Sequence, residues 1–422
     1  MAPKAPRPNQ NLIPDPYRHL LRLVSAQADG TSMRVYLAGG IVRDLLLGRP
    51  IKDLDLVVEG DAIRLARSLA KSHGGKVTVH PRFGTATWLL PADTLTVDMA
   101  ITSLDLATAR RETYPYPGAL PVVEFAGIQD DLSRRDFAIN AMALQPEDGH
   151  ATNLLDPFGG RRDLEQHLVR VLHPRSFVDD PTRMFRALRY SDRYGFAIAP
   201  DTLSLFNAEA LRTLGSLSGE RLRHELDLIF EEAHPAHILR QAAELGLLAA
   251  IDPRLPGFDT TLEKLLHSAP GSGLGSGGDR KILGYLLWLA DLAPEVLTEL
   301  SRRLAFDGAL DRALRSAAHL LRDLPKLREA KPSQWTERLD RVPQAAIEAV
   351  YLRTGEPALD HYLHTWQHIH PRANGEELKR RGLVPGPAFK TILARLRSAW
   401  LDGEVSNEQG EAALLERLLK DR

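Results

Sequence analysis

The sequence contains no cysteine. Disulfides, thiolate zinc sites and a cysteine nucleophile are therefore excluded, and any metal must be bound by oxygen or imidazole ligands. The 15 histidines form neither an HExxH motif nor a His-Asp doublet, which argues against a zinc hydrolase or a fused phosphohydrolase domain.

Long apolar segments are also missing. No stretch of 18 or more apolar residues occurs, and residues 1–16 are rich in proline and polar residues, without the apolar core of a signal peptide. We therefore expect a cytoplasmic protein with a flexible leader over residues 1–16 and no membrane partner. The net charge is only −1, so an RNA partner would have to meet a local basic face.

Length and pattern indicate an α+β protein of several domains. The chain has 422 residues, of which 43% are hydrophobic and 26% charged, as in globular proteins. Residues 17–155 alternate between helical periodicity and short β-prone runs, which predicts a catalytic head with a mixed sheet. Helical spacing then predicts an all-helical neck and body over 156–267 and a body and tail over 281–422. The Gly- and Ser-rich segment 268–280 predicts a linker or loop.

The segment 36–61 carries the first candidate site. Gly39 and Gly40 end a predicted strand and open a helix, so backbone N–H groups can face a phosphate without an intervening side chain. Arg43 and Asp44 follow within the first turn. Taken alone, the two glycines are equally consistent with a plain tight turn.

Asp53 and Asp55 follow in the same segment. They are separated by one residue on a predicted strand, which would point both carboxylates to one face. Like charges so placed repel unless one or two hard divalent cations compensate them. Magnesium binds such oxygens together with substrate phosphates, so the pair suits two-metal phosphoryl transfer to a hydroxyl. The alternative for an isolated DxD motif is a solvated strand end.

Together these residues resemble the class II tRNA nucleotidyltransferase and poly(A) polymerase family, whose first motif reads GG, VRD and then DxD. Further motifs follow in family order: RRDFAINAMAL at 134–144, DPFGG at 156–160, DDPTRMFRALRYSDRYGF at 179–196 and SGERLRHEL at 218–226. The resemblance spans about residues 35–230. It implies template-independent addition of nucleotides from CTP and ATP to the 3′ end of tRNA, with Mg²⁺ as cofactor and pyrophosphate as leaving group.

The resemblance also implies roles for single residues. Asp53 and Asp55 would bind the metal, and together with Asp105 they would be the catalytic carboxylates. The implied nucleotide-binding residues are Gly39, Gly40, Arg43, Asp44, Arg110, Arg135, Asp136, Asn140, Asp179, Asp180, Arg183, Arg186 and Arg189. Asp98 competes with Asp105 because strand register alone cannot say which acid faces the site; for Asp98 we prefer an exposed strand residue.

Asp180 and Arg183 also allow a physical argument. They are three residues apart on a predicted helix and carry an acceptor and a planar donor fork that can hydrogen-bond a base edge. In the family the corresponding pair contacts the incoming base. An intrahelical ion pair is the alternative. Asp179 departs from the family, which usually has Glu there; the shorter acid would either shift the base geometry or keep only an N-terminal helix contact.

Residues 111–128 are rich in Pro, Gly, Tyr and charged residues, which predicts a long surface loop. In the family this loop helps to change the pocket from C to A addition, and enzymes that add only CC have it shortened. Its presence favours A addition, either by a complete CCA-adding enzyme or by an A-adding enzyme that works with a separate CC-adding enzyme.

Two basic groups are candidates for RNA contacts. Arg183, Arg186, Arg189 and Arg193 recur at helical spacing and predict a stripe that can follow phosphates. The second group comprises Lys379, Arg380, Arg381, Lys390, Arg395 and Arg397, for which ordinary solvated helix surface is an equally good explanation.

The leading hypothesis is therefore an enzyme that adds CCA, or its terminal A, to tRNA. A poly(A) polymerase is disfavoured because such enzymes of this family commonly carry a strongly basic C-terminal extension, whereas residues 406–422 are near neutral. A non-catalytic RNA-binding protein is disfavoured by the paired carboxylates. Oligomeric state does not follow from the sequence, and a monomer is the default expectation.

Overall fold

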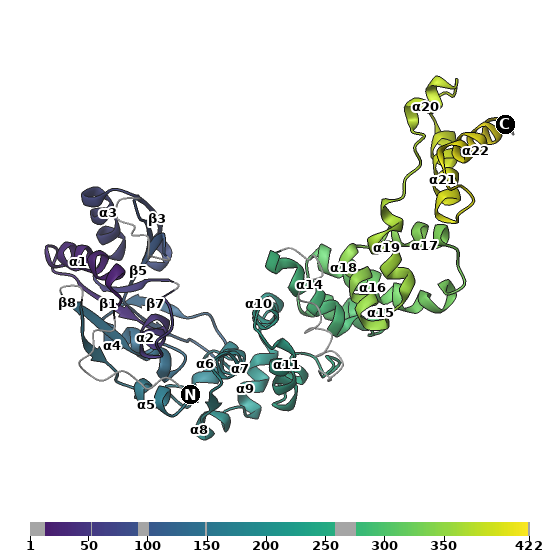
Figure 1. Ribbon diagram of the computed structural model, residues 1–422. Helices are drawn as coiled ribbons and strands as arrows, with labels where there is room; N and C mark the ends of the chain where they lie inside the picture. The colour runs from purple at the N-terminus through teal and green to yellow at the C-terminus, as the bar shows by residue number, and fades with distance from the viewer. Residues whose placement is uncertain (1–12, 52, 92–100, 148–149, 258–275, 421–422) are drawn as a thin grey trace. The chain divides into compact units, whose positions relative to one another are not determined.

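The computed structural model describes residues 13–51, 53–91, 101–147, 150–257 and 276–420. The chain divides into two compact units, Met1–Leu217 with Glu244–Ala250, and Ser218–Ala243 with Ile251–Arg422. Both are shown in Figure 1. The expected boundary at residue 155 falls inside the first unit, where helix α5 (Gly160–Glu165) contacts the short helix η2 (Ala138–Asn140). The division into head and neck there stays a prediction.

Within its described residues the first unit contains a mixed sheet of seven strands, in the order β3-β4-β5-β2-β1-β8-β9. The strands are β1 (Arg34–Ala38), β2 (Asp55–Glu59), β3 (Lys76–His80), β4 (Thr85–Leu89), β5 (Ser103–Thr108), β8 (Ala143–Glu147) and β9 (His150–Leu155). β2 and β5 are parallel neighbours, whereas β1 is antiparallel to β2 and to β8. This places the first motif, on β1 and β2, in the middle of the sheet.

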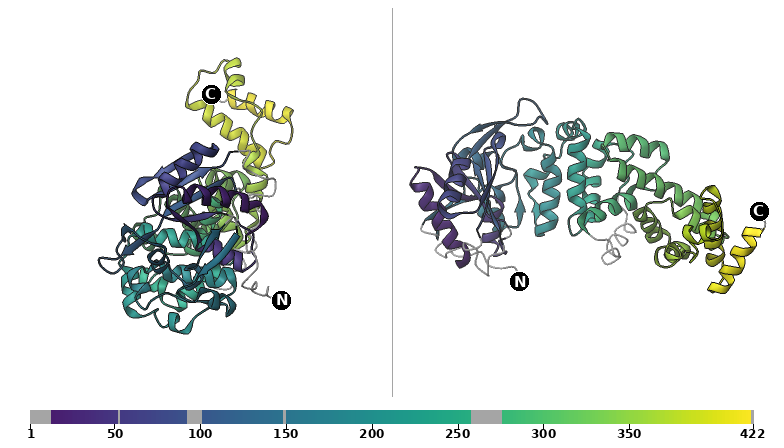
Figure 2. Two further views of the ribbon diagram at one scale, coloured as in Figure 1. Left: turned by 90° about the vertical axis from the view of Figure 1, so that its left-hand side faces the viewer. Right: turned by 90° about the horizontal axis from the view of Figure 1, so that it is seen from above.

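Helices α1 (Asp15–Asp29) and α3 (Ala62–His73) pack against each other and against the sheet (Figures 1 and 2). The side chain of Asp61 caps α3 by accepting from the backbone N–H of Arg64, and the helix buries Leu65 and Leu69 four residues apart. Helix α4 (Ile128–Ser133) closes a second apolar cluster on the sheet, which includes Tyr36, Ala38 and Val57. The predicted alternation of strands and helices therefore produces a two-layered core.

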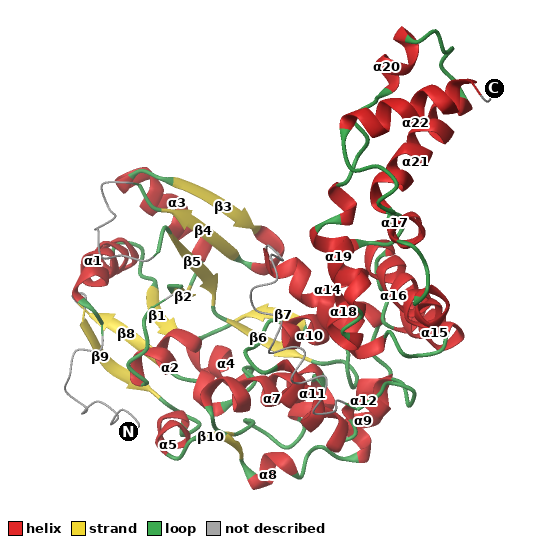
Figure 3. Cartoon of the chain, turned by 45° about the vertical axis from the view of Figure 1, so that its right-hand side comes forward, coloured by secondary structure: helices red, strands yellow, loops and turns green. Residues whose placement is uncertain are grey.

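The elements after the sheet are almost entirely helical, as Figure 3 shows in red. Between strands of the sheet in the sequence lie the short helices α2 (Gly40–Leu46) and η1 (Pro81–Phe83). After the sheet, the first unit includes α6 (Ser176–Asp179), α7 (Thr182–Tyr194), α8 (Pro200–Leu203), α9 (Ala208–Gly215) and the strand pair β10 (Leu168–Val169) and β11 (Ala197–Ile198). Helix α12 (Leu247–Ile251) ends at the boundary between the units.

Among its described residues, the second unit contains helices and their connecting loops but no strands. The helices are α10 (Gly219–Phe230), α11 (Pro235–Glu244), α14 (Ser276–Leu289), α15 (Pro294–Arg303), α16 (Gly308–Leu327), α17 (Pro332–Leu339), α18 (Gln344–Thr354), α19 (Pro357–His364), η3 (Trp366–His368), α20 (Gly375–Arg380), α21 (Pro387–Leu401) and α22 (Glu408–Lys420). The predicted α+β class, with a sheet first and helices after it, is confirmed. No helix in the described part of the chain is both long and apolar enough to cross a membrane.

Two predicted boundaries are revised. Helix α1 already begins at Asp15, so the last two residues of the expected leader are helical, while residues 1–12 lie outside the described residues. The expected linker 268–280 also lies mostly outside them, but residues 276–280 form the first part of α14.

Candidate active site

Three carboxylates gather at one end of the parallel strands β2 and β5. Asp55 is the first residue of β2 and pairs in register with Asp105 on β5. In-register residues of neighbouring strands are about 4.8 Å apart and point to the same face. Asp53 lies in the loop before β2, so its predicted place on the strand is wrong. All three side chains are exposed and accessible to a ligand.

The charges of this cluster act on one another. Although Asp55 is exposed overall, partial burial of its carboxyl group raises its pKa, and the charges of Asp105 and Asp53 raise the pKa further, against the opposing charge of Arg135. Thr87 on β4 donates a hydrogen bond to Oδ1 of Asp105 at 2.5 Å. The ionised cluster is therefore electrostatically unfavourable without a cation. Asp98, the competing third acid, lies outside the described residues.

The chemistry of these donors fits a hard divalent cation, since all are carboxylate oxygens and their charges repel. No three His, Asp or Glu side chains of the described residues already surround a common point closely enough to bind a metal ion.

Gly39 leaves room for Arg135. Its φ is +87°, a backbone conformation that residues other than glycine rarely adopt. A Cβ at this position would also collide with Nη1 of Arg135. Arg135 donates to Oδ2 of Asp131 at 2.8 Å and to the backbone carbonyl of Asn140 at 3.4 Å. The glycine that the sequence suggested for a phosphate turn thus also leaves space for Arg135, whose charge lowers the pKa of Asp55.

Arg43 is buried and fully engaged. Its Nη1 donates to Oδ1 of Asn140 at 2.6 Å, and its Nε and Nη2 donate to Asp44 at 3.0 and 2.9 Å. Its guanidinium carbon lies 4.6 Å from the ring centre of Tyr194 on α7. Burial alone would lower the pKa of Arg43, but the hydrogen bond and charge of Asp44 raise it. Arg43 and Asp44 therefore join α2 to α7, and their implied contact with nucleotide stays a prediction.

Asp136 makes a second link to α7. This buried carboxylate accepts from Nδ2 of Asn140 at 2.9 Å, from the N–H of Phe137 at 2.8 Å, and from Nε and Nη2 of Arg186 at 2.9 and 2.5 Å. Burial alone would raise the pKa of Asp136, but the charge of Arg186 and these hydrogen bonds lower it. The motif at 134–144 is thereby joined to α7.

The prediction that Asp180 and Arg183 share a helix is wrong. Asp180 has an extended backbone between α6 and α7, and its Oδ1 accepts from the hydroxyl and the N–H of Thr182 at 2.7 and 3.2 Å. Arg183 is on α7, with Nε 3.9 Å from Oδ2 of Asp180. The turn at Pro181, not helical periodicity, brings the acid and the arginine together. Beside them, Asp179 pairs with Arg175 at 3.5 Å.

The predicted phosphate-following stripe on α7 is wrong for most of its arginines. Arg183 and Arg189 are only 4% and 7% exposed, and Arg186 is bound to Asp136. Arg193, the last member of the stripe, is exposed.

In the second basic group most charges are already paired. Lys379 and Arg395 contact Glu376 and Glu404 at 2.6 and 2.5 Å. Arg380, Arg381 and Arg397 likewise form ion pairs with neighbouring acids. These contacts favour ordinary helix surface over a dedicated phosphate site.

The predicted loop 111–128 is largely a hairpin. Strand β6 (Arg110–Thr113) pairs with β7 (Val122–Phe125), and only residues 114–121 connect them. On β6, Glu112 accepts from Nη2 of Arg110 at 2.8 Å and from Nη1 of Arg134 at 3.1 Å. The alternation expected for a strand was hidden because the segment is short and highly charged.

Sequence reasoning missed Asp131 and Arg134. Asp131 is buried and accepts from Arg134 at 2.7 Å and from Arg135 at 2.8 Å. Burial alone would raise the pKa of Asp131, but the two arginines lower it. The spacing of three and four residues on a helix is a signal that could have identified this cluster.

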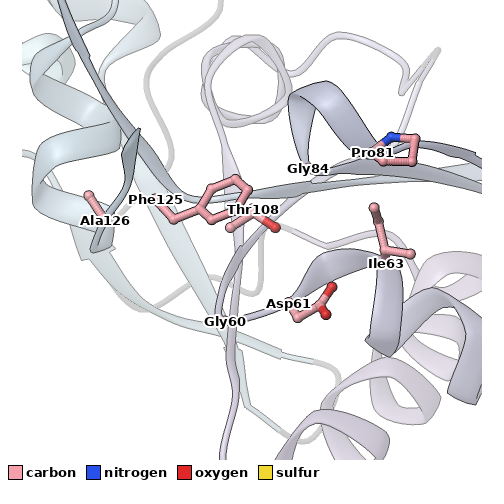
Figure 4. Close-up of a pocket in the computed structure, with 8 residues that line it drawn as sticks. All are labelled: Gly60, Asp61, Ile63, Pro81, Gly84, Thr108, Phe125 and Ala126. Carbon is pink, nitrogen blue, oxygen red and sulfur yellow. The ribbon is translucent and has the colours of Figure 1, made fainter. Parts of the chain in front are cut away.

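A pocket of about 620 Å³ lies at the other end of β2 and β5 (Figure 4). It is lined by Gly60, Asp61, Ile63, Pro81, Gly84, Thr108, Phe125 and Ala126. None of the predicted site residues lines it, so the candidate chemistry is at the opposite strand ends.

Comparison with known proteins identifies the family. Residues 35–170 match the family described as "Poly A polymerase head domain", and residues 195–258 match "Probable RNA and SrmB- binding site of polymerase A". Over 95% of its length the chain is 34% identical to an A-adding tRNA nucleotidyltransferase from Halalkalibacterium halodurans, of which the match covers 92%. The chain belongs to the class II tRNA nucleotidyltransferase family.

This tRNA nucleotidyltransferase has other near-full-length relatives. It is 31% identical to the CC-adding enzyme of Deinococcus radiodurans, with 92% of this chain and 91% of that protein covered. The solved structure of the Thermotoga maritima CCA-adding enzyme complexed with tRNA has a TM-score of 0.74 and 29% identity, and 97% of this chain and 96% of that chain are covered. The predicted family and enzyme class are confirmed.

Proposed function

We propose that this enzyme adds the terminal adenosine to tRNA that a separate CC-adding enzyme has already extended. The observation that carries the proposal is the similarity over nearly the whole chain to an A-adding enzyme, 34% against 31% for the CC-adding relative. It favours A addition alone over the complete CCA addition that headed the hypotheses from the sequence. The hairpin β6–β7 with residues 114–121 argues against an enzyme that adds only CC, because such enzymes have this loop shortened, and it is compatible with both A addition and complete CCA addition.

In this reaction the 3′-hydroxyl oxygen of the tRNA forms a bond to the α-phosphorus of ATP. The bond from that phosphorus to the bridging oxygen breaks, pyrophosphate leaves and the hydroxyl proton passes to water. Magnesium, when bound by Asp53 and Asp55, would supply charge neutralisation for the triphosphate and activation of the hydroxyl. Asp105 is the proposed third carboxylate because it pairs in register with Asp55.

The chain's own residues would position the nucleotide. Arg135, which is seated by Gly39 and acts electrostatically on Asp55, is placed to contact the triphosphate. Asp180 and Arg183 would contact the adenine edge. Asp131 and Asp136 would hold Arg135 and Arg186 in place through the buried ion pairs described above.

The proposal is tested by incorporation assays with CTP alone, ATP alone and both. The acceptors are tRNA lacking CCA, tRNA lacking only the terminal A, and an unrelated RNA. An A-adding enzyme extends only the second acceptor, by one nucleotide and only with ATP. Extension of the first acceptor by three nucleotides would indicate a CCA-adding enzyme, and a long product on the unrelated RNA would indicate a poly(A) polymerase.

A further inference from the structure

A row of polar side chains crosses three neighbouring strands at the carboxylate cluster. Thr87 on β4 pairs in register with Asp105 on β5, and Asp105 pairs in register with Asp55 on β2. In-register residues of neighbouring strands point to the same face of a sheet. The neighbours of Thr87 along its strand, Ala86 and Trp88, are buried on the other face. Thr87 therefore shares the face that carries the candidate metal site.

The hydrogen bond from Thr87 to Asp105 is short. Oγ1 of Thr87 lies 2.5 Å from Oδ1 of Asp105, whereas hydroxyl groups commonly lie about 2.7–2.8 Å from the oxygen that accepts from them. Distances of about 2.5–2.7 Å are typical of a hydroxyl that donates to an ionised carboxylate, and such bonds are stronger than those between neutral groups. Because threonine is β-branched, its χ1 angle is restricted and the hydroxyl keeps its direction. Asp105 is thus held through one of its two oxygens.

Thr87 orients Asp105 without cancelling its charge, because a hydroxyl is neutral. Among the side chains that the structure describes, no lysine or arginine forms an ion pair with Asp105. The charge of Asp105 instead acts on Asp55 and raises its pKa. An arginine at position 87 could hold the carboxylate equally well, but it would neutralise the charge that attracts a cation. A neutral donor is therefore suited to a carboxylate that has to bind metal.

The same hydrogen bond decides which oxygen of Asp105 is available. Strand β5 lies between β4 and β2, and Oδ1 is engaged on the side of β4. The two oxygens of a carboxylate lie on opposite sides of the Cβ–Cγ bond, so Oδ2 is left on the side of β2 and Asp55. A single carboxylate oxygen suits the strict octahedral shell of Mg²⁺, whereas Ca²⁺ readily takes both oxygens of one carboxylate.

We propose that Thr87 is a positioning residue of the metal site. Its hydroxyl holds Oδ1 of Asp105, so that Asp105 offers a cation only Oδ2, and this arrangement favours Mg²⁺ over Ca²⁺. The inference rests on the proposed function, in which Asp105 is the third carboxylate beside Asp53 and Asp55. It concerns the choice of metal and not the choice of base.

The test compares Thr87→Val, which keeps the β-branched shape and removes the hydroxyl, with Thr87→Ser, which keeps the hydroxyl. Each protein is unfolded thermally in chelator and in rising concentrations of Mg²⁺ or Ca²⁺, without nucleotide, and the rise in Tm gives an apparent Kd for each ion. In Thr87→Val the Kd for Mg²⁺ should increase about tenfold, the usual effect of removing a group that orients a metal ligand. The Kd for Ca²⁺ should increase less than about threefold, because the released Oδ1 can join Oδ2 in binding this ion. Thr87→Ser should retain the wild-type values.

Thr85→Val is the matched control. Thr85 is on the same strand and the same face, but it pairs in register with Ala107, which has no carboxylate. Both of its Kd values should equal those of the wild type. An unchanged Kd for Mg²⁺ in Thr87→Val, an equal loss for the two ions, or a Thr87→Ser that behaves like Thr87→Val would each overturn the inference.

Incorporation assays on tRNA lacking A and on tRNA lacking CCA test the proposed function separately. Wild-type enzyme that adds all three nucleotides contradicts A addition alone, while the Kd comparison still supports or overturns the role of Thr87. A wild-type Tm that neither ion raises contradicts the metal site and, with it, the role of Thr87.

Discussion

The carboxyl group of Asp55 is held in a place that disfavours its charge. Burial and the charges of Asp105 and Asp53 raise its pKa, so the ionised group costs stability until a cation is present. In a chelator, Asp55→Asn should therefore raise Tm by about 1–2 °C, although activity falls by about 100-fold or more.

The measurement is thermal unfolding of both proteins in chelator and in Mg²⁺. Added Mg²⁺ should raise Tm of the wild type and leave the variant nearly unchanged. A variant that is less stable than the wild type in chelator, or is stabilised equally by Mg²⁺, would contradict the proposed metal site.

At Gly39 the surroundings require glycine. Its positive φ and the closeness of Arg135 both exclude a Cβ. Gly48 also has a positive φ, +66°, but nothing lies within 4 Å of its Cβ position, so Gly48→Ala should cost only the backbone strain of about 1–2 kcal/mol. Gly39→Ala should cost more and should lower ATP incorporation about 100-fold, because Arg135 is displaced. Equal losses in the two variants, measured by thermal unfolding and incorporation, would contradict this account.

The ion pair of Asp136 and Arg186 joins two secondary-structure elements, the turn at η2 and helix α7. The lowered pKa of Asp136 means that the folded state favours its ionised form. Its stabilising contribution is complete above the unfolded pKa of about 3.9 and is lost as the pH falls through the lower folded value. Tm of the wild type should consequently fall more steeply below about pH 4 than that of Asp136→Asn. Parallel curves would show that this pair does not contribute to acid sensitivity.

The hairpin can be shortened without breaking its ladder, because Thr113 and Val122 are its last paired residues. Replacing residues 114–121 by Asn-Gly should form a tight two-residue turn. Tm should stay within a few degrees, while A addition to tRNA ending in CC falls about 100-fold through the loss of positioning at Arg183. Unchanged A addition would show that this segment takes no part in base selection.

Sequence patterns predicted some secondary-structure elements and missed others. The strand at Arg34–Ala38 was predictable from its short apolar, β-prone run, and that at Lys76–His80 from its alternating valines. The hairpin was not, since β6 and β7 are short charged segments whose pairing includes the cross-strand ion pair of Arg111 with Glu124 at 3.1 Å. Asp180 was misplaced for a related reason: helical spacing does not reveal that α7 begins only after Pro181.

At the scale of the whole molecule, the order of motifs was enough to predict the family and the α+β fold, whereas the orientation of charged faces was not. Arg183 and Arg189 of the stripe on α7 are buried and Arg186 is bound by Asp136, a tertiary effect that periodicity cannot encode. The candidate carboxylates Asp53 and Asp55 were recognisable as a pair, but the register that places Asp105 beside Asp55 is a property of the assembled sheet.

The central claim is that the enzyme adds adenosine to tRNA already ending in CC. The most direct measurement compares kcat/KM for ATP on that tRNA with kcat/KM for CTP on tRNA lacking CCA. The account predicts that the first value exceeds the second by at least about 100-fold. Comparable values, or efficient incorporation of CTP, would contradict it.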